Sequence, residues 1–372
     1  MGAACSFDLY SWFSRWVLII AMFGAFLCHG GYRIEEARAS STPAFWRVDW
    51  GGFAERLERQ SEDGFSKLDL FRLRRQQGKT YCHDLRRFLI EDGRLDIRVA
   101  YGYFDAVYGK KISFSYWEAD PWSIGNDIFG RSLISGKSIA PALDGEEFLA
   151  LMGLLTKKCP VNQPDRWACG FEVLFGGPGL RRVVLKKNIT WDGQPVPAYI
   201  TVTFSSASPF HEKNIGELSA LQNQLSWQSA RNFLEGLGSA DVVFYVGHSR
   251  KLGGPDFWPP VLRSGDFKVN YDYYNELREG RRLLLTWLQA RRNVHGVLGL
   301  ISCESHLFLS DVLDVHPSLS VIYTKKQISS FESTVGLALY LDSILGGKCV
   351  SDVTQFLNQK IIKSDFYETV NF

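Results

Sequence analysis

Two residues with reactive side chains, His248 and Cys303, follow two apolar segments at equivalent places. His248 comes one glycine after residues 241–246 (DVVFYV), and Cys303 comes one serine after residues 297–301 (VLGLI). Apolar runs of this length are typical of strands that are covered on both faces of a sheet. A single crossover helix, expected at residues 274–292, would make the two strands neighbours about 5 Å apart. A thiol that meets an imidazole at one sheet edge can become an activated nucleophile.

Each of these residues also has an ordinary structural explanation. A cysteine after a buried strand often serves only as a small apolar core residue, and a histidine at a strand end is often a satisfied polar group. The presence of both at equivalent positions favours a reactive site. His306 is a second candidate base, although it lies beyond the predicted strand end, and His211, His295 and His316 are expected at the surface or in turns.

The elements that must position His248 and Cys303 begin near residue 196. Strands predicted at 198–204, 241–246, 297–301 and 319–323 alternate with helices predicted at 215–237 and 274–292, and two further helices start at Ser329 and Asp352. This alternation predicts an α/β domain over residues 196–372. We expect a mostly parallel sheet with helices on both faces, in a Rossmann-like three-layer arrangement.

Residues 40–195 have a different pattern, which predicts an α+β N-terminal domain. Amphipathic helices are predicted at 53–60, 68–77 and 146–157, and strands at 171–175 and 181–187. Residues 95–117 alternate apolar and polar positions on either side of Gly109-Lys110, as a β-hairpin does. This region could be an inhibitory pro-region, a domain that recruits substrates, or a scaffold.

The first 39 residues resemble an export signal. Arg15 precedes an apolar run at residues 16–28, which is shorter than the roughly 20 residues that span a bilayer. Its length fits a signal-peptide core, and Ala37-Arg38-Ala39 offers a cleavage site. An uncleaved N-terminal anchor is the alternative. We therefore expect an exported protein that is periplasmic, bound to the cell envelope or secreted, and the style of the sequence favours a bacterial envelope.

The cysteines agree with an oxidising compartment. Of the seven cysteines, five remain after residues 1–39 are removed, so at least one of them has no partner within the chain. Cys159 and Cys169, which flank Pro160 and Pro164, are expected to form a disulfide, with buried free thiols as the alternative. The chain has no CxxC pair, so we expect no zinc or other metal site and no cofactor. With 42 basic and 40 acidic residues, it gives no reason to expect a nucleic-acid partner.

The order of strand, histidine, helix, strand and cysteine resembles that of the caspase-like cysteine peptidases, which include caspases, legumains, gingipains and CHAT-type domains. Residues 300–305 (LISCES) are similar to the CHAT-type cysteine motif, and the resemblance covers about residues 196–360. It implies that Cys303 is the nucleophile, that His248 is the general base or acid, and that the N–H groups of Gly247 and Cys303 form an oxyanion hole. Ser249 and Ser302 stand where this group usually has glycine and alanine.

The segment after His248, HSRKLGGPDFWPP, is rich in charged and aromatic residues. Arg250 and Asp256 could contact a charged substrate, and Trp258 could form the wall of a pocket. Alternatively, the aromatic and proline residues attach the loop to the domain.

The sequence supports two functions from different classes. The first is an exported cysteine peptidase that cleaves peptide bonds in a protein or peptide substrate through Cys303 and His248. The second is a catalytically inactive caspase-like module that binds or scaffolds partners at the cell envelope. A metal-dependent hydrolase ranks third, because acidic residues are sparse near His248. Contact with a membrane is expected only through residues 16–28, if they are not removed.

Overall fold

The computed structural model describes residues 53–75, 92–104, 144–177, 181–191, 193–208, 211–250, 254–265, 269–290, 296–328 and 330–372. Contacts divide the chain into Met1–Ser40 and Ser41–Phe372, and all of these residues belong to the second unit. The predicted signal segment and the second arm of the predicted hairpin lie outside the described residues. Within the described part, no helix is long and apolar enough to cross a membrane.

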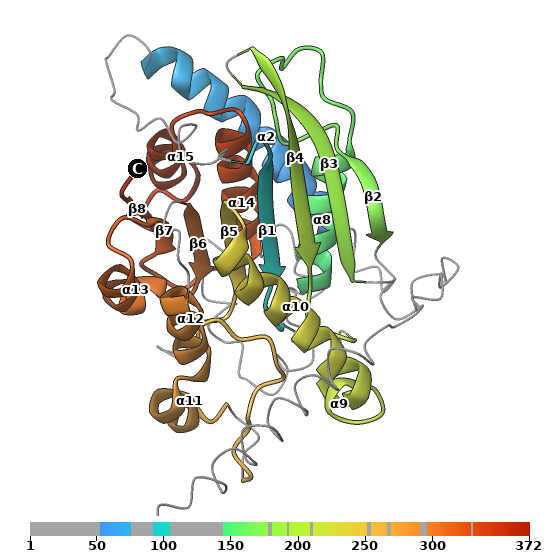
Figure 1. Ribbon diagram of the computed structural model, residues 1–372, viewed down its shortest axis with the longest axis vertical. Coiled ribbons are helices and arrows are strands. Elements are labelled where there is room, and N and C mark those ends of the chain that lie inside the picture. Colours follow the sequence, from blue (N-terminus) through green and yellow to red (C-terminus); the bar gives the residue numbers. More distant parts are fainter. Residues whose placement is uncertain are drawn as a thin grey trace, which may run out of the picture. The chain divides into compact units, whose positions relative to one another are not determined.

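The described strands form one eight-stranded sheet in the order β2-β3-β4-β1-β5-β6-β7-β8 (Figure 1). Neighbouring strands from β4 to β7 are parallel. The edges are antiparallel, with β2 and β3 on one side and β8 on the other. The predicted mostly parallel α/β sheet is confirmed. The strands are β1 (Leu95–Tyr101), β2 (Glu172–Gly177), β3 (Arg182–Trp191), β4 (Gln194–Thr203), β5 (Val242–Gly247), β6 (Val297–Ser302), β7 (Ser320–Thr324) and β8 (Tyr367–Val370).

The helices follow the predicted pattern with two changes. The helices expected at 53–60 and 68–77 are one continuous helix, α2, and the helix expected at 274–292 divides at Arg278, whose φ of 48° is left-handed. The helices are α2 (Phe53–Arg75), α8 (Asp144–Thr156), α9 (His211–Ile215), α10 (Ser219–Ser239), α11 (Tyr271–Leu277), α12 (Glu279–Ala290), α13 (Leu309–Val315), α14 (Ser330–Leu345) and α15 (Val350–Phe356), with short turns η3 (Ser305–Phe308) and η4 (Leu357–Ile361).

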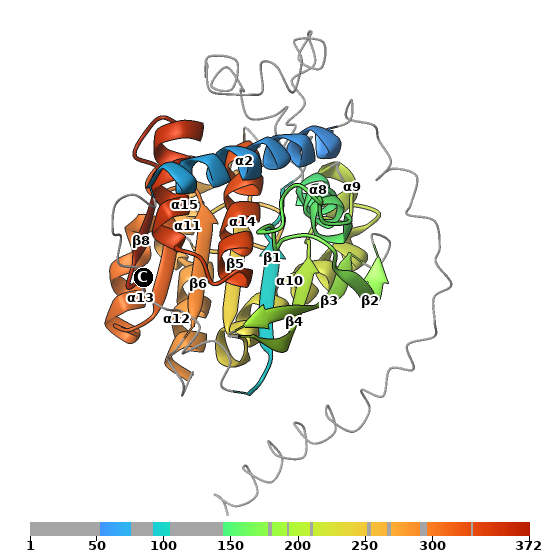
Figure 2. The same ribbon diagram turned by 90° about the horizontal axis from the view of Figure 1, so that it is seen from above.

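Two apolar clusters lie on opposite faces of the sheet. Alternate residues of a strand point to opposite faces, and Phe244 and Val246 of β5 accordingly pack in a cluster with α8, α14 and α15. Val243 and Tyr245 pack in the second cluster, with α10, α12 and α13. Figure 2 shows α14 and α12 on opposite sides of the strands. Strands covered on both faces explain the nearly continuous apolar runs in the sequence.

The expected boundary between residues 195 and 196 falls inside β4 and does not separate two sheets. Strands β1 to β3, which precede it, pair in the same sheet as β4 to β8. The hairpin interpretation of residues 95–117 depended on alternating apolar and polar residues around Gly109-Lys110, and the polar residues of its first arm include Asp96 and Arg98. In the structure these two form an ion pair 2.8 Å long, and the N–H of Asp96 donates to Asp241, so a strand with polar residues occupies the middle of the sheet.

Candidate active site

The register of β5 and β6 puts His248 and Cys303 at neighbouring positions just beyond the ends of the two strands. Gly247 pairs with Ser302 across the two parallel strands, and the next residues are His248 and Cys303. Alternate residues of β5 and β6 face α14, and His248 and Cys303 are the next residues of that alternate series in their strands. The site therefore lies at the carboxyl edge of the sheet, where open α/β sheets bind ligands.

The end of β1 adjoins this edge as well. Because β1 lies between β4 and β5, the order of strands changes direction there, which marks the usual position of a ligand crevice. The N–H of Gly102 donates to the carbonyl of Val246 at 2.8 Å, and the ring of Phe104 lies 4.4 Å from that of His248 between centroids. Three strand ends thus meet around the histidine.

Cys303 is the only free cysteine among the described residues. Its Sγ accepts a hydrogen bond from the N–H of Ile328, at 3.4 Å, just before α14. Burial raises the pKa of this thiol to about 11, and the carboxylates of Glu304 and Glu332 act in the same direction, while the N–H groups of Ile328 and of Cys303 itself oppose them. The thiol is therefore protonated at neutral pH.

His248 is also uncharged at neutral pH. Burial lowers the pKa of its imidazole to about 3, and the charge of Arg250 contributes to the decrease. Its Nε2 is buried and has no hydrogen-bond partner among the described residues. Its main-chain carbonyl accepts a 2.6 Å hydrogen bond from the hydroxyl of Tyr245, which fixes the start of the loop.

The turn that carries Cys303 is held by side-chain hydroxyls. Ser249 donates to the carbonyl of Cys303, and Thr324 donates to the carbonyl of Ser302. Glu304, which follows the cysteine, has a left-handed φ of 51°. Such a conformation is unfavourable for a residue with a side chain, so the surrounding bonds must maintain it.

The two expected oxyanion donors differ in their surroundings. Gly247 has a φ of 153°, and a Cβ there would lie 3.1 Å from the Cα of Gly102, so the close approach of β1 requires glycine. The N–H of Cys303 lies next to its own Sγ. A carbonyl carbon attacked by this sulfur would place its oxygen near that N–H.

The charged residues of the loop after His248 bind each other. Arg250 and Asp256 form an ion pair in which both side chains are largely buried, and the guanidinium also lies 5.4 Å from the ring of Tyr274. Trp258 packs edge-on against Trp227, with centroids 5.2 Å apart. These contacts agree with the expectation that the loop is attached to the domain, and they engage the three residues that we expected to contact a substrate.

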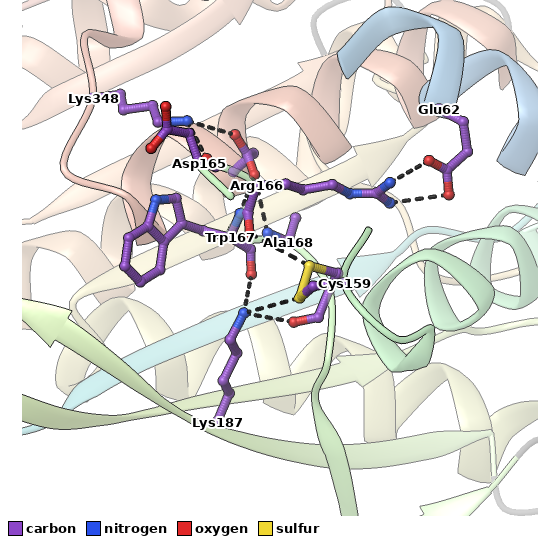
Figure 3. Close-up of a disulfide and its surroundings, with 10 residues drawn as sticks. Glu62, Cys159, Asp165, Arg166, Trp167, Ala168, Lys187 and Lys348 are labelled. Carbon is purple, nitrogen blue, oxygen red and sulfur yellow. Dashed lines mark hydrogen bonds and ion pairs between the residues drawn. A yellow bond between two sulfur atoms is a disulfide. The ribbon is translucent and has the colours of Figure 1, made fainter. Parts of the chain in front are cut away.

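The predicted disulfide between Cys159 and Cys169 is confirmed (Figure 3). Lys187 donates to the carbonyl of Cys169 at 2.7 Å, and Arg166 pairs with Glu62 of α2. Asp342, near the C-terminal end of α14, accepts the N–H groups of two residues in the same loop. The disulfide therefore braces one end of α14, whereas Cys303 lies near the other.

Other histidines take structural positions. His211 and His316, which we expected at the surface or in turns, are both buried. The ring of His211 contacts the hydroxyl of Tyr103, and the ring of His316 contacts the carbonyl of Leu288. His306 lies in η3, where its Nδ1 is buried without a partner among the described residues. Among those residues no group of three or more histidine, cysteine or carboxylate side chains could hold a metal ion.

Comparisons with known proteins give no relative for this chain: no family model matches, and no significant match exists among curated proteins or solved structures.

Proposed function

We propose that the protein is a caspase-like cysteine peptidase that cleaves peptide bonds through Cys303, with His248 as the general base and acid. The observation that supports the proposal is the β5–β6 register, in which His248 and the free cysteine Cys303 directly follow the paired residues Gly247 and Ser302 at the carboxyl edge of the sheet. The mostly parallel sheet and the resemblance of residues 196–360 to that group support the same function.

The reaction would proceed by acyl transfer. The Sγ of Cys303 attacks the carbonyl carbon of the peptide bond while its proton passes to His248, and the carbonyl oxygen becomes an oxyanion that accepts the N–H of Cys303. When this intermediate collapses, the carbon–nitrogen bond breaks and His248 returns the proton to the leaving amine. Water then attacks the thioester, gives a proton to His248, and releases the carboxylic acid and the thiol.

Because both groups are uncharged at rest, the thiolate must form during the attack rather than before it. The pKa of the thiol is raised to about 11 and that of the imidazole lowered to about 3, so proton transfer between them is unfavourable in the free protein. A bound substrate that displaces water and adds hydrogen bonds at the oxyanion can supply the missing stabilisation. The free enzyme is accordingly expected to be a slow target for alkylating agents.

The test is cleavage of a mixed-sequence peptide library by the full chain in water enriched in oxygen-18, with products identified by mass spectrometry. We expect products that carry one heavy oxygen at the new carboxylate, and we expect Cys303→Ala to abolish them and His248→Ala to reduce them. Cleavage that survives unchanged in Cys303→Ala would remove the assignment.

A second candidate is a non-catalytic binding module with the same fold. It is favoured by the uncharged state of both groups and by Ser249, which replaces the glycine usual after the histidine and whose hydroxyl is committed to Cys303. This alternative predicts no cleavage of any library peptide and no loss of partner binding in Cys303→Ala.

We further propose that the protein is exported to the periplasm, the cell envelope or the medium. The disulfide Cys159–Cys169 and the disulfide-bonded state of Cys349 support an oxidising compartment. Mature protein recovered from these fractions is expected to begin at Ser40 if the signal is cleaved. Recovery of the whole chain only from the cytoplasm would contradict the proposal.

A further inference from the structure

The peptide groups on either side of Cys303 are both anchored by hydroxyl groups from the flanking strands. Thr324, the last residue of β7, donates to the carbonyl of Ser302, and Ser249, two residues after β5, donates to the carbonyl of Cys303. Thr324 is 0% exposed and Ser249 is 2% exposed. Buried hydrogen bonds of this kind are costly to break, because the carbonyl left behind cannot reach water.

Thr324 is itself held in place by Ser305. The N–H of Thr324 donates to the Oγ of Ser305 at 2.9 Å, and the two hydroxyl oxygens lie 3.2 Å apart. The hydroxyl of Ser305 donates to the carbonyl of Leu300 at 2.7 Å, which ties the network back to β6. The position of the Thr324 hydroxyl is therefore set by β7 together with Ser305, which is tied to β6.

Anchoring a carbonyl also fixes the N–H of the same peptide group. A trans peptide is planar, and its N–H points opposite to its C=O. The bond from Thr324 to the carbonyl of Ser302 therefore orients the N–H of Cys303. The bond from Ser249 to the carbonyl of Cys303 likewise orients the N–H of Glu304, which donates to the carbonyl of Lys326 at 3.0 Å. The N–H of Cys303, by contrast, lies next to its own Sγ, the atom that would attack a carbonyl.

We propose that Thr324 is a positioning residue that holds the N–H of Cys303 toward the oxyanion formed in acyl transfer, and that Ser249 supports it by fixing the next peptide group of the turn. The inference rests on the proposed peptidase function and explains why a serine can follow His248. The left-handed Glu304 makes the turn prone to relax, and the two hydroxyls oppose that relaxation from both sides. The role concerns the transition state, because the oxyanion does not exist in the free enzyme or in the bound substrate.

The experiment compares two reagents that both reach Cys303 but differ in the need for an oxyanion hole. A peptide aldehyde built on the best-cleaved library sequence forms a hemithioacetal, whose oxygen needs the N–H. Iodoacetamide, used at pH 9, displaces iodide without forming an oxyanion. In Thr324→Val we expect kcat and aldehyde affinity to fall by on the order of 10- to 100-fold, with KM and the iodoacetamide rate within about twofold of wild type. Thr324→Ser keeps the hydroxyl and is expected to restore both.

Thr334→Val is the matched control, since Thr334 is buried in α14 and its hydroxyl has no partner among the described residues. This variant should leave every readout unchanged. Ser249→Ala tests the second anchor, and it should weaken aldehyde binding more than alkylation even if Thr324→Val does not fold.

The possible results separate this inference from the proposed function. An active wild type whose kcat and aldehyde affinity are unchanged in Thr324→Val and Ser249→Ala would overturn the positioning role alone. If Thr324→Val and Ser249→Ala each lose aldehyde binding and alkylation to the same extent, and Thr324→Ser loses them as well, the two hydroxyls have a merely structural role. That result would also overturn the positioning role. A wild type that neither hydrolyses peptides nor binds aldehydes would overturn the proposed function, and the inference with it.

Discussion

The buried carboxyl group of Glu147 provides a quantitative test of the structure. Glu147 lies in the first turn of α8, is 7% exposed, and accepts a 2.6 Å hydrogen bond from the hydroxyl of Ser333 in α14. Its pKa is raised from 4.5 to about 7, chiefly by burial and slightly by the charge of Asp144, while the hydroxyls of Ser333 and Ser330 act in the opposite direction. The carboxyl group therefore prefers to be protonated in the folded protein.

The higher pKa of Glu147 in the folded protein than in the unfolded chain determines how the free energy of unfolding changes with pH. Below pH 4.5 the group is protonated in both folded and unfolded chains, so it costs nothing. As the pH rises toward 7, the unfolded chain loses the proton more readily than the folded protein, and the free energy of unfolding falls. A tenfold change in proton affinity is worth about 1.4 kcal/mol, so the rise of the Glu147 pKa from 4.5 to about 7 corresponds to roughly 3 kcal/mol. Above pH 7 the whole amount is lost.

Replacing Glu147 with Gln removes the titration and keeps an oxygen for Ser333. We expect the free energy of unfolding of Glu147→Gln, relative to wild type, to increase by about 3 kcal/mol between pH 4 and pH 8.5. Urea unfolding followed by tryptophan fluorescence at several pH values, with the disulfides intact, measures the difference. Glu217→Gln is the control, because that side chain is 66% exposed and should change stability by less than about 0.5 kcal/mol at every pH. A difference that is constant with pH, or one that favours wild type at high pH, would refute the reasoning.

Three further changes test other contacts. Ser302→Ala should raise the free energy of unfolding by up to about 1 kcal/mol in urea titrations, because its buried Oγ has no partner among the described residues; a clear loss would contradict this. Asp256→Ala should lower it by about 3–5 kcal/mol, because Arg250 loses the carboxylate that binds it, and a loss below 1 kcal/mol would argue against the buried ion pair. Replacing both Cys159 and Cys169 by serine should lower the free energy of unfolding, measured by thermal denaturation, by about 2–4 kcal/mol and leave peptide cleavage unchanged. Reduced cleavage in the folded variant would be the contrary result.

The apolar strand pattern predicted most of the sheet, because strands covered on both faces must be apolar throughout. The pattern failed for strands that depend on residues distant in the sequence. The central strand β1 contains Asp96 and Arg98, and the distant Asp241 helps to accommodate them, so its local pattern resembled an exposed hairpin. Strand β8 was not predicted, because its four residues, YETV, are mixed in character and the side chain of Asn358 helps to hold its first residue.

The candidate site was predicted only in part for a similar reason. The positions of His248 and Cys303 follow from where strands end, which a sequence shows. The bonds from Ser249 and Thr324 to main-chain carbonyls have no sequence signature, since any serine or threonine can form them once the fold brings it near. Arg250, which forms the ion pair with Asp256, has a left-handed φ of 37°, which local patterns do not indicate for arginine.

The most direct test of the central claim is covalent labelling of the full chain with a mixture of peptidyl acyloxymethyl ketones, with the modified residue found by mass spectrometry. These reagents present a carbonyl next to the leaving group, so their reaction draws on both His248 and the oxyanion donors. If Cys303 is the peptidase nucleophile, it will be the labelled residue, it will react with at least one ketone much faster than with iodoacetamide at pH 7, and His248→Ala will remove that advantage. If Cys303 remains unlabelled, or reacts equally fast in His248→Ala, the proposed Cys303–His248 chemistry is wrong.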